Sequence, residues 1–493
     1  MDKNAKVHEK FLCEIWKNQE FTKELTTKDE QKITVIDVGM ENKELGGPDF
    51  KNARIKIGNI TYFGDIEIDN FYSDWKTHGH YLNKRYNKVI LHLALKNDSN
   101  LPYVFTQDGR KVQSILIEDC IDKNIQAAIQ EAIISERKNR INKMPCNEIN
   151  ELVTEQEKLN YLYELGLSRF RKKSEKILER LKEIIYLKEL NIKEPVIKYE
   201  LDEKFHNKIF TSEELADTEA WEQLFYELIF EALGYSKNKE IMQRLAQSVQ
   251  ISFLRSFLKQ EKFQQRMEAV LFHVSGLIPE NAAPADHDTA EYLKKISVLW
   301  NQIKPFYDGV TYHSSQWHFF KLRPQNFPTV RLAGGVVILH RILTRNLLNR
   351  IISLFDGKIN LNKLTTELRN LLIVKGEGYW SKHYVFDQAA GQEIKYFIGV
   401  SRADEILVNV ILPAAAIYFE IFNKKAEGQQ VVKLFLNYLQ KSENNLVNEV
   451  SSTLYLHDAW KRSVFYQGMI ELFRNYCSRD KCLECNIGKR IFN

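Results

Sequence analysis

Acidic residues and histidines are concentrated in residues 36–95, in an order that metal-dependent chemistry would need. Asp49 stands where a Gly-Gly-Pro turn meets a predicted strand. The next strand carries Asp65, Glu67 and Asp69, which share one face because side chains alternate along a strand. Carboxylates from two neighbouring strands can converge on a hard divalent cation. The segment therefore predicts a metal site.

A purely structural interpretation of the same residues carries comparable weight. Asp49 would then only cap a turn, and Asp65 and Glu67 would lie on a solvated sheet face. His78 and His80, in the polar segment that follows, would only satisfy buried backbone groups. The sequence alone leaves both interpretations open.

Short β-rich segments would position these side chains. Tight-turn dipeptides at Gly58-Asn59 and Asp108-Gly109 each predict a hairpin. Apolar residues at helical spacing predict an amphipathic helix over Lys6–Glu24. Strands are predicted at Lys32–Val38, Arg54–Ile57, Thr61–Ile68 and Lys88–Leu95, and the Asp108-Gly109 hairpin is predicted over Tyr103–Ile117.

From about Glu118 onward, long lysine-, glutamate- and leucine-rich segments predict helices. These helices are predicted at Glu157–Leu190, Trp221–Leu233, Lys239–Leu258 and Thr289–Ile303. We therefore expect an α+β chain. Its expected parts are an αβ domain over residues 1–125, a helical region over 126–310 and a second helical region over 311–493.

Composition sets further limits. With 493 residues, 44% of them hydrophobic, the chain can bury large cores and is expected to form two to four domains. A net charge of +5 permits a DNA or RNA partner without requiring one. No apolar run reaches the roughly 18 to 20 residues of a membrane span, and the first residues do not resemble a signal peptide. We therefore expect a cytoplasmic protein without a membrane partner; the oligomeric state is left open.

Cysteines form a second candidate metal site. Cys477, Cys482 and Cys485 fall within nine residues, and three thiolates at this spacing can bind zinc or an iron–sulfur cluster. Cys146, in a Met-Pro-Cys turn, is the preferred fourth ligand, and His457 is the alternative. Such a site would return the C-terminal tail to the junction behind the αβ domain. Its metal would be structural and would clamp the helical part onto that domain.

Two further segments contain residues of functional interest. Arg323 and Arg331 flank a proline-containing turn and could bind a phosphate or a carboxylate. The favoured interpretation is that they tie this turn to the end of a neighbouring helix. In the aromatic segment Gly376–Tyr384, His383 is expected to be packed rather than catalytic.

Short motifs along nearly the whole chain form a specific set. They are Gly47-Pro48-Asp49-Phe50, Gly64-Asp65-Ile66-Glu67-Ile68, Ser73-Asp74-Trp75, His78-Gly79-His80, Arg323-Pro324-Gln325-Asn326-Phe327-Pro328, Tyr379-Trp380, His383-Tyr384 and Cys482-Leu483-Glu484-Cys485. Through these motifs the chain resembles a Bacteroidota family catalogued as domain of unknown function 2851. This resemblance brings no activity with it.

Residues 11–95 also resemble the core of the PD-(D/E)xK nuclease superfamily, in the order helix, strand, Pro-Asp turn, acidic hairpin arm, helix and strand. The resemblance implies a restriction-endonuclease-like mixed sheet with flanking helices. It also implies a metal-dependent nuclease in which Asp49 and Glu67 hold Mg²⁺ or Mn²⁺. One departure is that Asp69 stands where the family has its lysine.

The remaining roles in such a nuclease would fall to nearby residues. Lys76, His78 or His80 would replace the missing lysine, with the histidines moving protons. Lys76, Arg323 and Arg331 are candidate substrate-binding residues, and Glu14 could complete the carboxylate set. The alternative is a catalytically inactive scaffold with a structural zinc or iron–sulfur site. Convergence of Asp49, Glu67 and a third polar group within ~5 Å would favour the enzyme.

Overall fold

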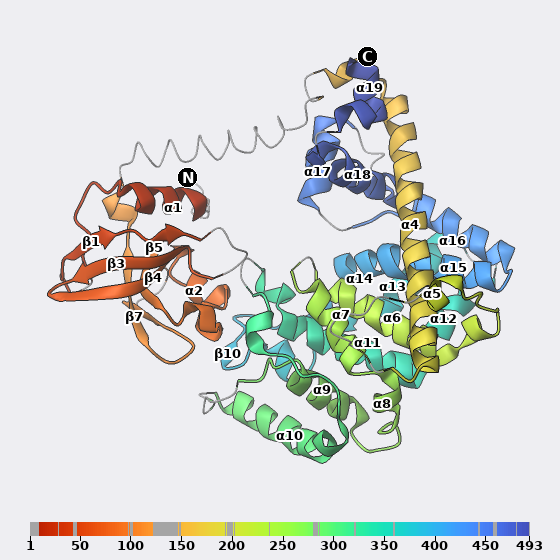
Figure 1. The fold of residues 1–493 in the computed structure, drawn as a ribbon, viewed down its shortest axis with the longest axis horizontal. Coiled ribbons are helices and arrows are strands. Elements are labelled where there is room, and N and C mark those ends of the chain that lie inside the picture. The colour runs from red at the N-terminus through yellow and green to blue at the C-terminus, as the bar shows by residue number, and fades with distance from the viewer. Residues whose placement is uncertain are drawn as a thin grey trace. The chain divides into compact units, whose positions relative to one another are not determined.

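The chain forms two compact units in a computed structural model (Figure 1). The αβ unit comprises Met1–Arg140 and Ser314–Phe327, and the helical unit comprises Ile141–His313 and Pro328–Asn493. The expected α+β class is confirmed. The structure describes residues 9–27, 29–42, 47–96, 98, 102–121, 146, 149–192, 194, 201, 203–235, 237–279, 284, 286–319, 322–357, 360–441, 444–456, 461–479 and 481–492.

The αβ unit is built on a mixed sheet with strand order β1-β3-β4-β5-β7-β6, in which β2 also pairs with β3. Strands β1, β3 and β4 form an antiparallel meander, whereas β5 is parallel to β4 and β7 is parallel to β5. The elements are α1 Glu9–Asn18, β1 Ile33–Asp37, β2 Met40–Glu41, β3 Phe50–Ile57, β4 Ile60–Phe71, α2 Asp74–Thr77, β5 Val89–Lys96, β6 Tyr103–Phe105 and β7 Lys111–Leu116.

The two faces of the sheet differ in character. On one face Ile66 and Ile68 of β4 pack with Leu12 and Trp16 of α1 in an apolar core. Helix α1 lies along this face of the sheet (Figure 1). The intervening residues of β4 are the carboxylates predicted to share a face, so they point to the opposite side. The sequence pattern therefore places an apolar core on one side of β4 and a row of acids on the other.

A short helical crossover joins β4 to β5. It consists of α2 and two 3₁₀ turns, His80–Leu82 and Lys84–Tyr86. Trp75 and Tyr86 of this crossover pack with Val89 and Ala94 of β5 in a second cluster. The crossover thus lies over the acidic face of the sheet.

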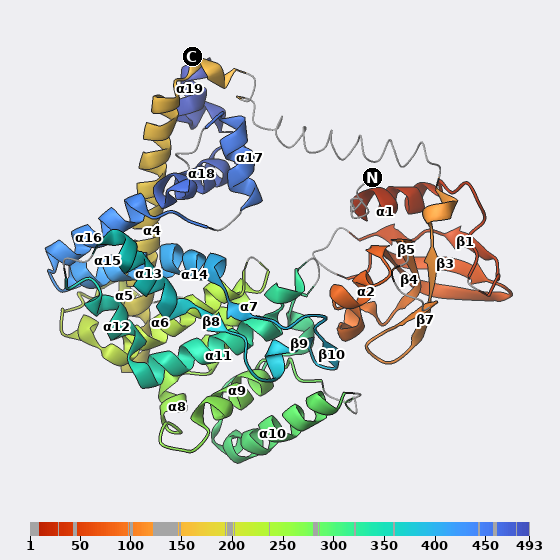
Figure 2. The same cartoon turned by 180° about the vertical axis from the view of Figure 1, so that it is seen from behind.

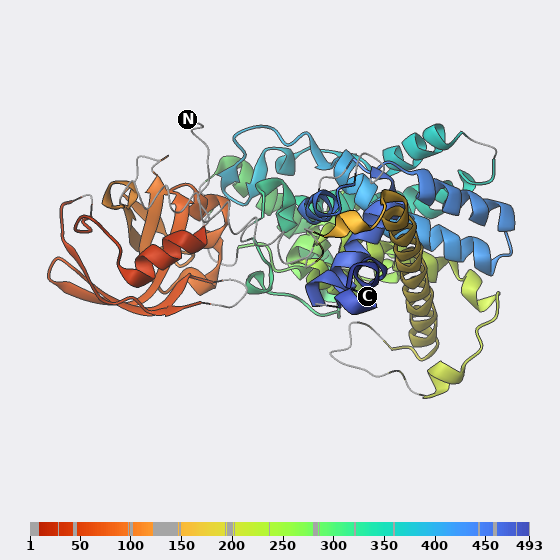
Figure 3. The ribbon, with the colours of Figure 1, turned by 90° about the horizontal axis from the view of Figure 1, so that it is seen from above.

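The helical unit is organised around the long helix α4, Glu155–Glu189 (Figures 2 and 3). This helix begins with a capping box formed by Thr154 and Glu157. Helix α18 packs along α4 through glycines: a Cβ on Gly166 would lie 2.0 Å from the Val464 carbonyl oxygen. A Cβ on Gly468 would lie 2.1 Å from the Leu162 carbonyl oxygen. These glycines let the two helix backbones approach closely.

The helices of this unit are α4 Glu155–Glu189, α5 Glu203–Asn207, α6 Thr218–Leu233, α7 Lys239–Ser248, α8 Ile251–Arg255, α9 Phe263–Val274, α10 His287–Ile303, α11 Pro328–Arg345, α12 Leu347–Ser353, α13 Leu361–Leu372, α14 Val400–Ile406, α15 Leu412–Ile421, α16 Lys425–Asn437, α17 Asn445–Thr453, α18 Ser463–Asn475 and α19 Asn486–Phe492. A π-helical turn, Leu407–Ile411, joins α14 to α15. Short strands are β8 Val374–Lys375, β9 His383–Val385, β10 Gln388–Ala389 and β11 Tyr396–Ile398.

The division of the chain differs from the three consecutive parts expected from the sequence. Helix α4 packs against α6, α15 and α18, so helices from both expected helical regions form one unit. Residues 314–327 belong instead to the αβ unit, where a Cβ on Gly79 would lie 2.9 Å from the Cβ of Phe319. Tertiary packing sets both assignments.

No helix in the described part of the chain is long and apolar enough to cross a membrane.

Candidate metal centre

Asp69 on β4 is surrounded by three imidazoles. His78 Nδ1 lies 3.0 Å from Asp69 Oδ1, and His92 Nε2 lies 3.2 Å from Asp69 Oδ2. His80 Nε2 lies 3.5 Å from Asp69 Oδ2. One ligand atom from each of Asp69, His78 and His80 lies within 4.8 Å of the other two. These three side chains could hold one metal ion.

Sheet register and one glycine position this cluster. In the parallel pairing of β4 with β5, His92 stands opposite Glu67, which is two residues before Asp69 on the same face of β4. Ser114 of β7 stands opposite His92, and the Ser114 Oγ lies 2.8 Å from His92 Nδ1. This contact leaves the other ring nitrogen of His92, Nε2, facing Asp69. Gly79 adopts a left-handed conformation with φ of +77°, which turns the chain between His78 and His80.

Glu67 extends the cluster toward Asp49. Glu67 Oε1 lies 3.1 Å from His80 Nε2, and Glu67 Oε2 accepts a hydrogen bond of 3.1 Å from the Asp49 amide. Asp49 Oδ2 in turn accepts a hydrogen bond of 2.9 Å from the Ile68 amide. Asp49 and Glu67 are therefore neighbours, but one oxygen of Asp49 is used to join β3 to β4.

Asp65 lies on the same face of β4 as Glu67 and Asp69, but its environment differs from theirs. Its Oδ1 accepts a hydrogen bond of 3.0 Å from the Asn52 amide. Asn52 has a φ of +60° and lies at the irregularity in the β3–β4 pairing. Asp65 is thus tied to the backbone of β3, whereas Asp69 is tied to histidines.

The cluster is deeply buried, and burial shapes its charges. Asp69, His80 and His92 are fully buried, and Glu67 is 1% exposed. Burial alone would raise the pKa of the Asp69 carboxyl, but the imidazoles of His80, His78 and His92 hold this pKa well below its usual 3.8. Burial lowers the pKa of His80 below its usual 6.5, although Asp69 opposes the shift. The folded protein therefore favours an ionised Asp69 beside a neutral His80.

Aromatic rings enclose the site. Trp75 has its ring centroid 5.2 Å from that of His80 and 5.3 Å from that of His92, and its Nε1 donates a hydrogen bond of 2.9 Å to the Phe105 carbonyl. The Tyr86 ring lies 4.2 Å from that of His80. Burial raises the pKa of Tyr86 well above 10, and the nearby carboxylates of Glu67, Asp49 and Asp69 raise it further.

The other predicted site residues are dispersed. Lys76 is exposed on α2, two residues before His78. The side chain of Glu14 lies outside the described part. Arg323 is exposed in the αβ unit, whereas Arg331 is buried in α11 of the helical unit. Arg331 donates hydrogen bonds to the Phe397 carbonyl of β11 and, at 2.9 Å, to the Tyr235 hydroxyl.

His383 is packed, as expected. It is 3% exposed, its ring stacks on Tyr379 with centroids 4.1 Å apart, and its Nε2 lies 2.8 Å from Asp286 Oδ2.

Sequence reasoning missed His92 and Ser114. The only signal for His92 was a single histidine inside an otherwise apolar strand, VILHLAL, next to the acidic arm. Ser114 carried no signal, because only the β5–β7 register brings it to His92.

The four predicted cysteine ligands all belong to the helical unit. Cys485 is buried in an apolar cluster, against which Cys146 and Cys477 pack. His457 lies outside the described residues. Because Cys146 and the tail share one unit, a site formed by them would tie that unit together, rather than clamp it onto the αβ unit.

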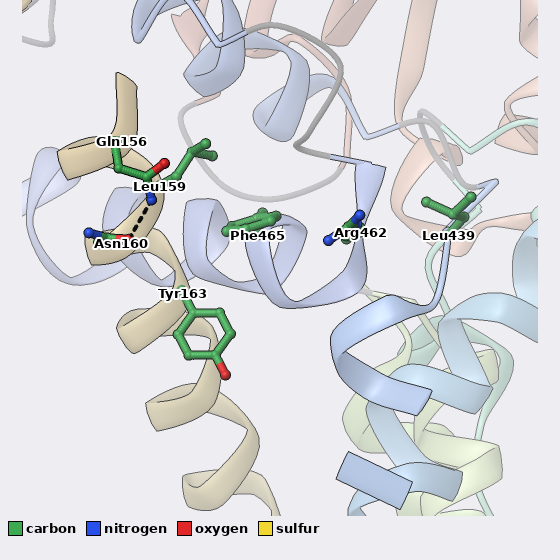
Figure 4. A pocket seen from close by; sticks show the side chains of 7 residues that line it. All are labelled: Gln156, Leu159, Asn160, Tyr163, Leu439, Arg462 and Phe465. Carbon is green, nitrogen blue, oxygen red and sulfur yellow. Dashed lines mark hydrogen bonds between the residues drawn. The ribbon is translucent and has the colours of Figure 1, made fainter. Parts of the chain in front are cut away.

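An open pocket of about 490 Å³ also lies in the helical unit (Figure 4). Gln156 and Asn160 of α4 hydrogen bond to each other at 2.8 Å on its wall. None of its lining residues is an acid, a histidine or a cysteine, so it offers no metal ligands. The lining residues are Gln156, Leu159, Asn160, Tyr163, Leu439, Arg462 and Phe465.

Fold and site together define an α+β protein with a buried carboxylate–histidine cluster on a mixed sheet. The family model described as "Protein of unknown function (DUF2851)" matches residues 9–190 and 184–445, and the chain belongs to this family. Neither the curated proteins nor the solved structures include a match.

Proposed function

We propose that the αβ unit is a metal-dependent phosphodiesterase that cleaves DNA or RNA in the cytoplasm. The observation that carries this proposal is the convergence of Asp69, His78 and His80, with ligand atoms all within 4.8 Å of one another. Two imidazoles and a carboxylate form a common ligand set for divalent transition metals. Nitrogen ligands favour Mn²⁺ over Mg²⁺ at this site.

The topology supports a nuclease over other hydrolases. A helix, an antiparallel meander, a short helical crossover and a parallel strand follow one another, as in the PD-(D/E)xK core. Asp49 precedes β3, and Glu67 lies on β4, in the places where that core has its acidic residues. Asp69 stands in the lysine position, where it would act as a ligand of the ion instead.

Each side chain has a role in this scheme. A bound divalent ion would polarise a phosphate oxygen and lower the pKa of a water molecule. His78 is 9% exposed, more than Asp69 or His80, so it is the proposed ligand nearest to solvent. Lys76 would attract the phosphate backbone, and the contact between His92 and Ser114 would orient Asp69.

A second candidate function is a catalytically inactive nucleic-acid-binding or protein-binding scaffold. The burial of Asp69, His80 and His92 favours this alternative, because a polynucleotide needs access to the reacting groups. The use of an Asp49 oxygen by the Ile68 amide favours it as well.

A cleavage assay separates the two candidates. Purified full-length protein is incubated with single-stranded and duplex DNA and RNA in Mn²⁺ or Mg²⁺, beside the Asp69→Asn and Asp65→Asn variants. Asp65→Asn is a matched control, since it changes a carboxylate on the same strand face that contacts a backbone amide instead of histidines. If the protein is a nuclease, we expect Mn²⁺-dependent cleavage. The Asp69→Asn variant should lower the cleavage rate at least ~10³-fold, and the Asp65→Asn variant should stay within ~10-fold of wild type. Absence of cleavage on every substrate would favour the scaffold.

A further inference from the structure

The helical unit brings together four cysteines that are far apart in the chain. Cys146 precedes α4, whereas Cys477, Cys482 and Cys485 follow α18. Cys485 is 7% exposed in an apolar cluster, and Cys146 and Cys477 pack against that cluster. Residues of α4 and α18, including Tyr161 and Met469, form the rest of it.

The four cysteines lie close to one another. Cys146 and Cys477 pack against the apolar cluster that contains Cys485. Cys482 is hydrogen bonded to Cys485 through the backbone. All four cysteines thus share one neighbourhood.

The loop that carries three of these cysteines is tightly built. The Cys485 amide donates a hydrogen bond of 3.2 Å to the Cys482 carbonyl. In α19, a Cβ on Gly488 would lie 2.0 Å from the same carbonyl oxygen. Only glycine lets α19 approach the Cys482 turn this closely, so the turn is held in a defined conformation.

A buried lysine provides an independent observation. Lys158 is 4% exposed, and its Nζ donates hydrogen bonds of 2.7 Å to Asn150 Oδ1 and 3.1 Å to the Leu454 carbonyl. Both acceptors are neutral, and within the described residues no carboxylate lies within ion-pair distance of Lys158. A buried ammonium is costly unless a negative charge compensates it. Metal-bound thiolates at Cys146 would supply that charge.

We propose that Cys146, Cys477, Cys482 and Cys485 bind a thiolate metal centre that ties the start of α4 to the C-terminal α19. This proposal does not depend on the nuclease activity of the αβ unit. Soft thiolate ligands select zinc or an iron–sulfur cluster.

The spacing of the thiols favours the iron–sulfur cluster. Four sulfurs bound to one tetrahedral zinc at about 2.3 Å lie roughly 3.8 Å apart. Among the described residues, which include all four cysteines, no three of these sulfurs lie within 4.8 Å of one another. A four-iron cluster holds its thiolates farther apart, because each thiolate binds a different iron.

The test is metal and sulfide analysis of the full-length protein purified without oxygen, from cells supplied with iron and zinc. The expected result is about four iron and four acid-labile sulfide per chain, with a visible charge-transfer band. Serine variants at the four positions are expected to lose the iron. Cys120→Ser, which changes a half-buried thiol of the αβ unit, is expected to keep it.

Each other outcome has a defined meaning. One zinc per chain, lost in the four variants and retained in Cys120→Ser, would support the thiolate centre and overturn the iron–sulfur assignment. Less than about 0.1 metal per wild-type chain, with six free thiols on denaturation, would overturn the proposal; the six thiols are those of the whole sequence. Two disulfides among the four cysteines would also overturn it. The counts of metal, sulfide and free thiols are made on wild-type protein, so they do not depend on the variants folding.

Discussion

The two candidate metal sites are built in opposite ways. The cluster of Asp69, His78 and His80 comes from one short stretch, and a crossover lays the histidines over their own strand. The cysteine cluster joins two distant parts of the chain at the ends of α4 and α18. The first has carboxylate and imidazole ligands in a polar network, and the second has thiols in an apolar cluster.

This difference in ligands predicts different roles for a metal ion at the two sites. Asp69 already has three imidazole partners, so its carboxylate is balanced without a metal. Lys158, which packs near the cysteine cluster, is buried and has only neutral hydrogen-bond acceptors. The first site is therefore expected to bind metal for chemistry, and the second is expected to need metal for stability.

The largest expected effect on stability comes from Asp69→Ala. Removing this carboxylate leaves three imidazoles beside Glu67 without their central partner. Breaking a buried charged network costs about 3 to 5 kcal/mol. Hydrogen exchange of the β4 and β5 amides measures the loss. Asp65→Ala removes one acceptor of a backbone amide and should cost about 1 kcal/mol. Equal losses in the two variants would contradict the central role of Asp69.

The Lys158→Met variant tests the role of metal at the cysteine cluster. If metal-bound thiolates compensate this ammonium, the substitution destabilises the metal-loaded protein more than the metal-free protein, by about 2 kcal/mol. Urea unfolding of both forms measures the difference. Lys172→Met is the control on the same helix, because its side chain is 59% exposed and pairs with Glu471 at 3.0 Å. A Lys158→Met effect that is the same in both forms would show that the lysine does not sense the metal.

The αβ unit is expected to lose stability below about pH 6.5. His80 has a folded-state pKa below its usual 6.5, so the unfolded chain binds a proton first as the pH falls. Its contribution is complete above pH 6.5 and declines as the pH falls toward the lowered folded-state pKa. Asp69, with a pKa well below 3.8, adds a loss only in stronger acid.

Hydrogen exchange of metal-free protein between pH 7.5 and 5.0 checks this expectation, after correction for the intrinsic exchange rate. Protection of the β4 amides should fall in wild type and change less in His80→Gln. His273 of the helical unit, whose pKa burial lowers to about 4, should cause a parallel loss there. Protection of β4 that does not change with pH would contradict the neutral, buried state of His80.

Lys76→Ala is expected to have the smallest effect. The side chain is exposed, so stability should change by less than about 0.5 kcal/mol. If Lys76 contacts a phosphate, nucleic-acid affinity should weaken roughly 3- to 10-fold in the variant. The slope of log affinity against log salt concentration should become shallower by about one. Lys56→Ala, an exposed lysine on β3, is the control. Equal effects of the two variants on binding would remove Lys76 from the substrate-binding surface.

Local chemistry explains what the sequence predicted well. Gly58, with φ of +57°, forms the expected turn between β3 and β4, and the predicted helix Glu157–Leu190 is found as α4. The alternation along β4 predicted that Asp65, Glu67 and Asp69 share one face, and in the structure that face lies opposite the apolar core.

Tertiary contacts explain what it did not predict. The predicted helix Lys239–Leu258 is divided into α7 and α8, because the Gln223 side chain bonds the Ala246 carbonyl and the Ile251 amide. Sequence spacing favoured Asp49 and Glu67 as ligands, whereas the closest ligand group centres on Asp69. The register of β5 and the Gly79 turn, which local pattern does not encode, bring the histidines to that residue.

The central claim is that Asp69, His78 and His80 form a metal site. Anomalous diffraction from crystals soaked in Mn²⁺ tests it most directly. The account predicts one manganese peak at about 2.0 to 2.3 Å from an Asp69 oxygen and a nitrogen of each histidine. A map without a peak there, in which these side chains keep their hydrogen bonds to one another while manganese binds elsewhere, would contradict it.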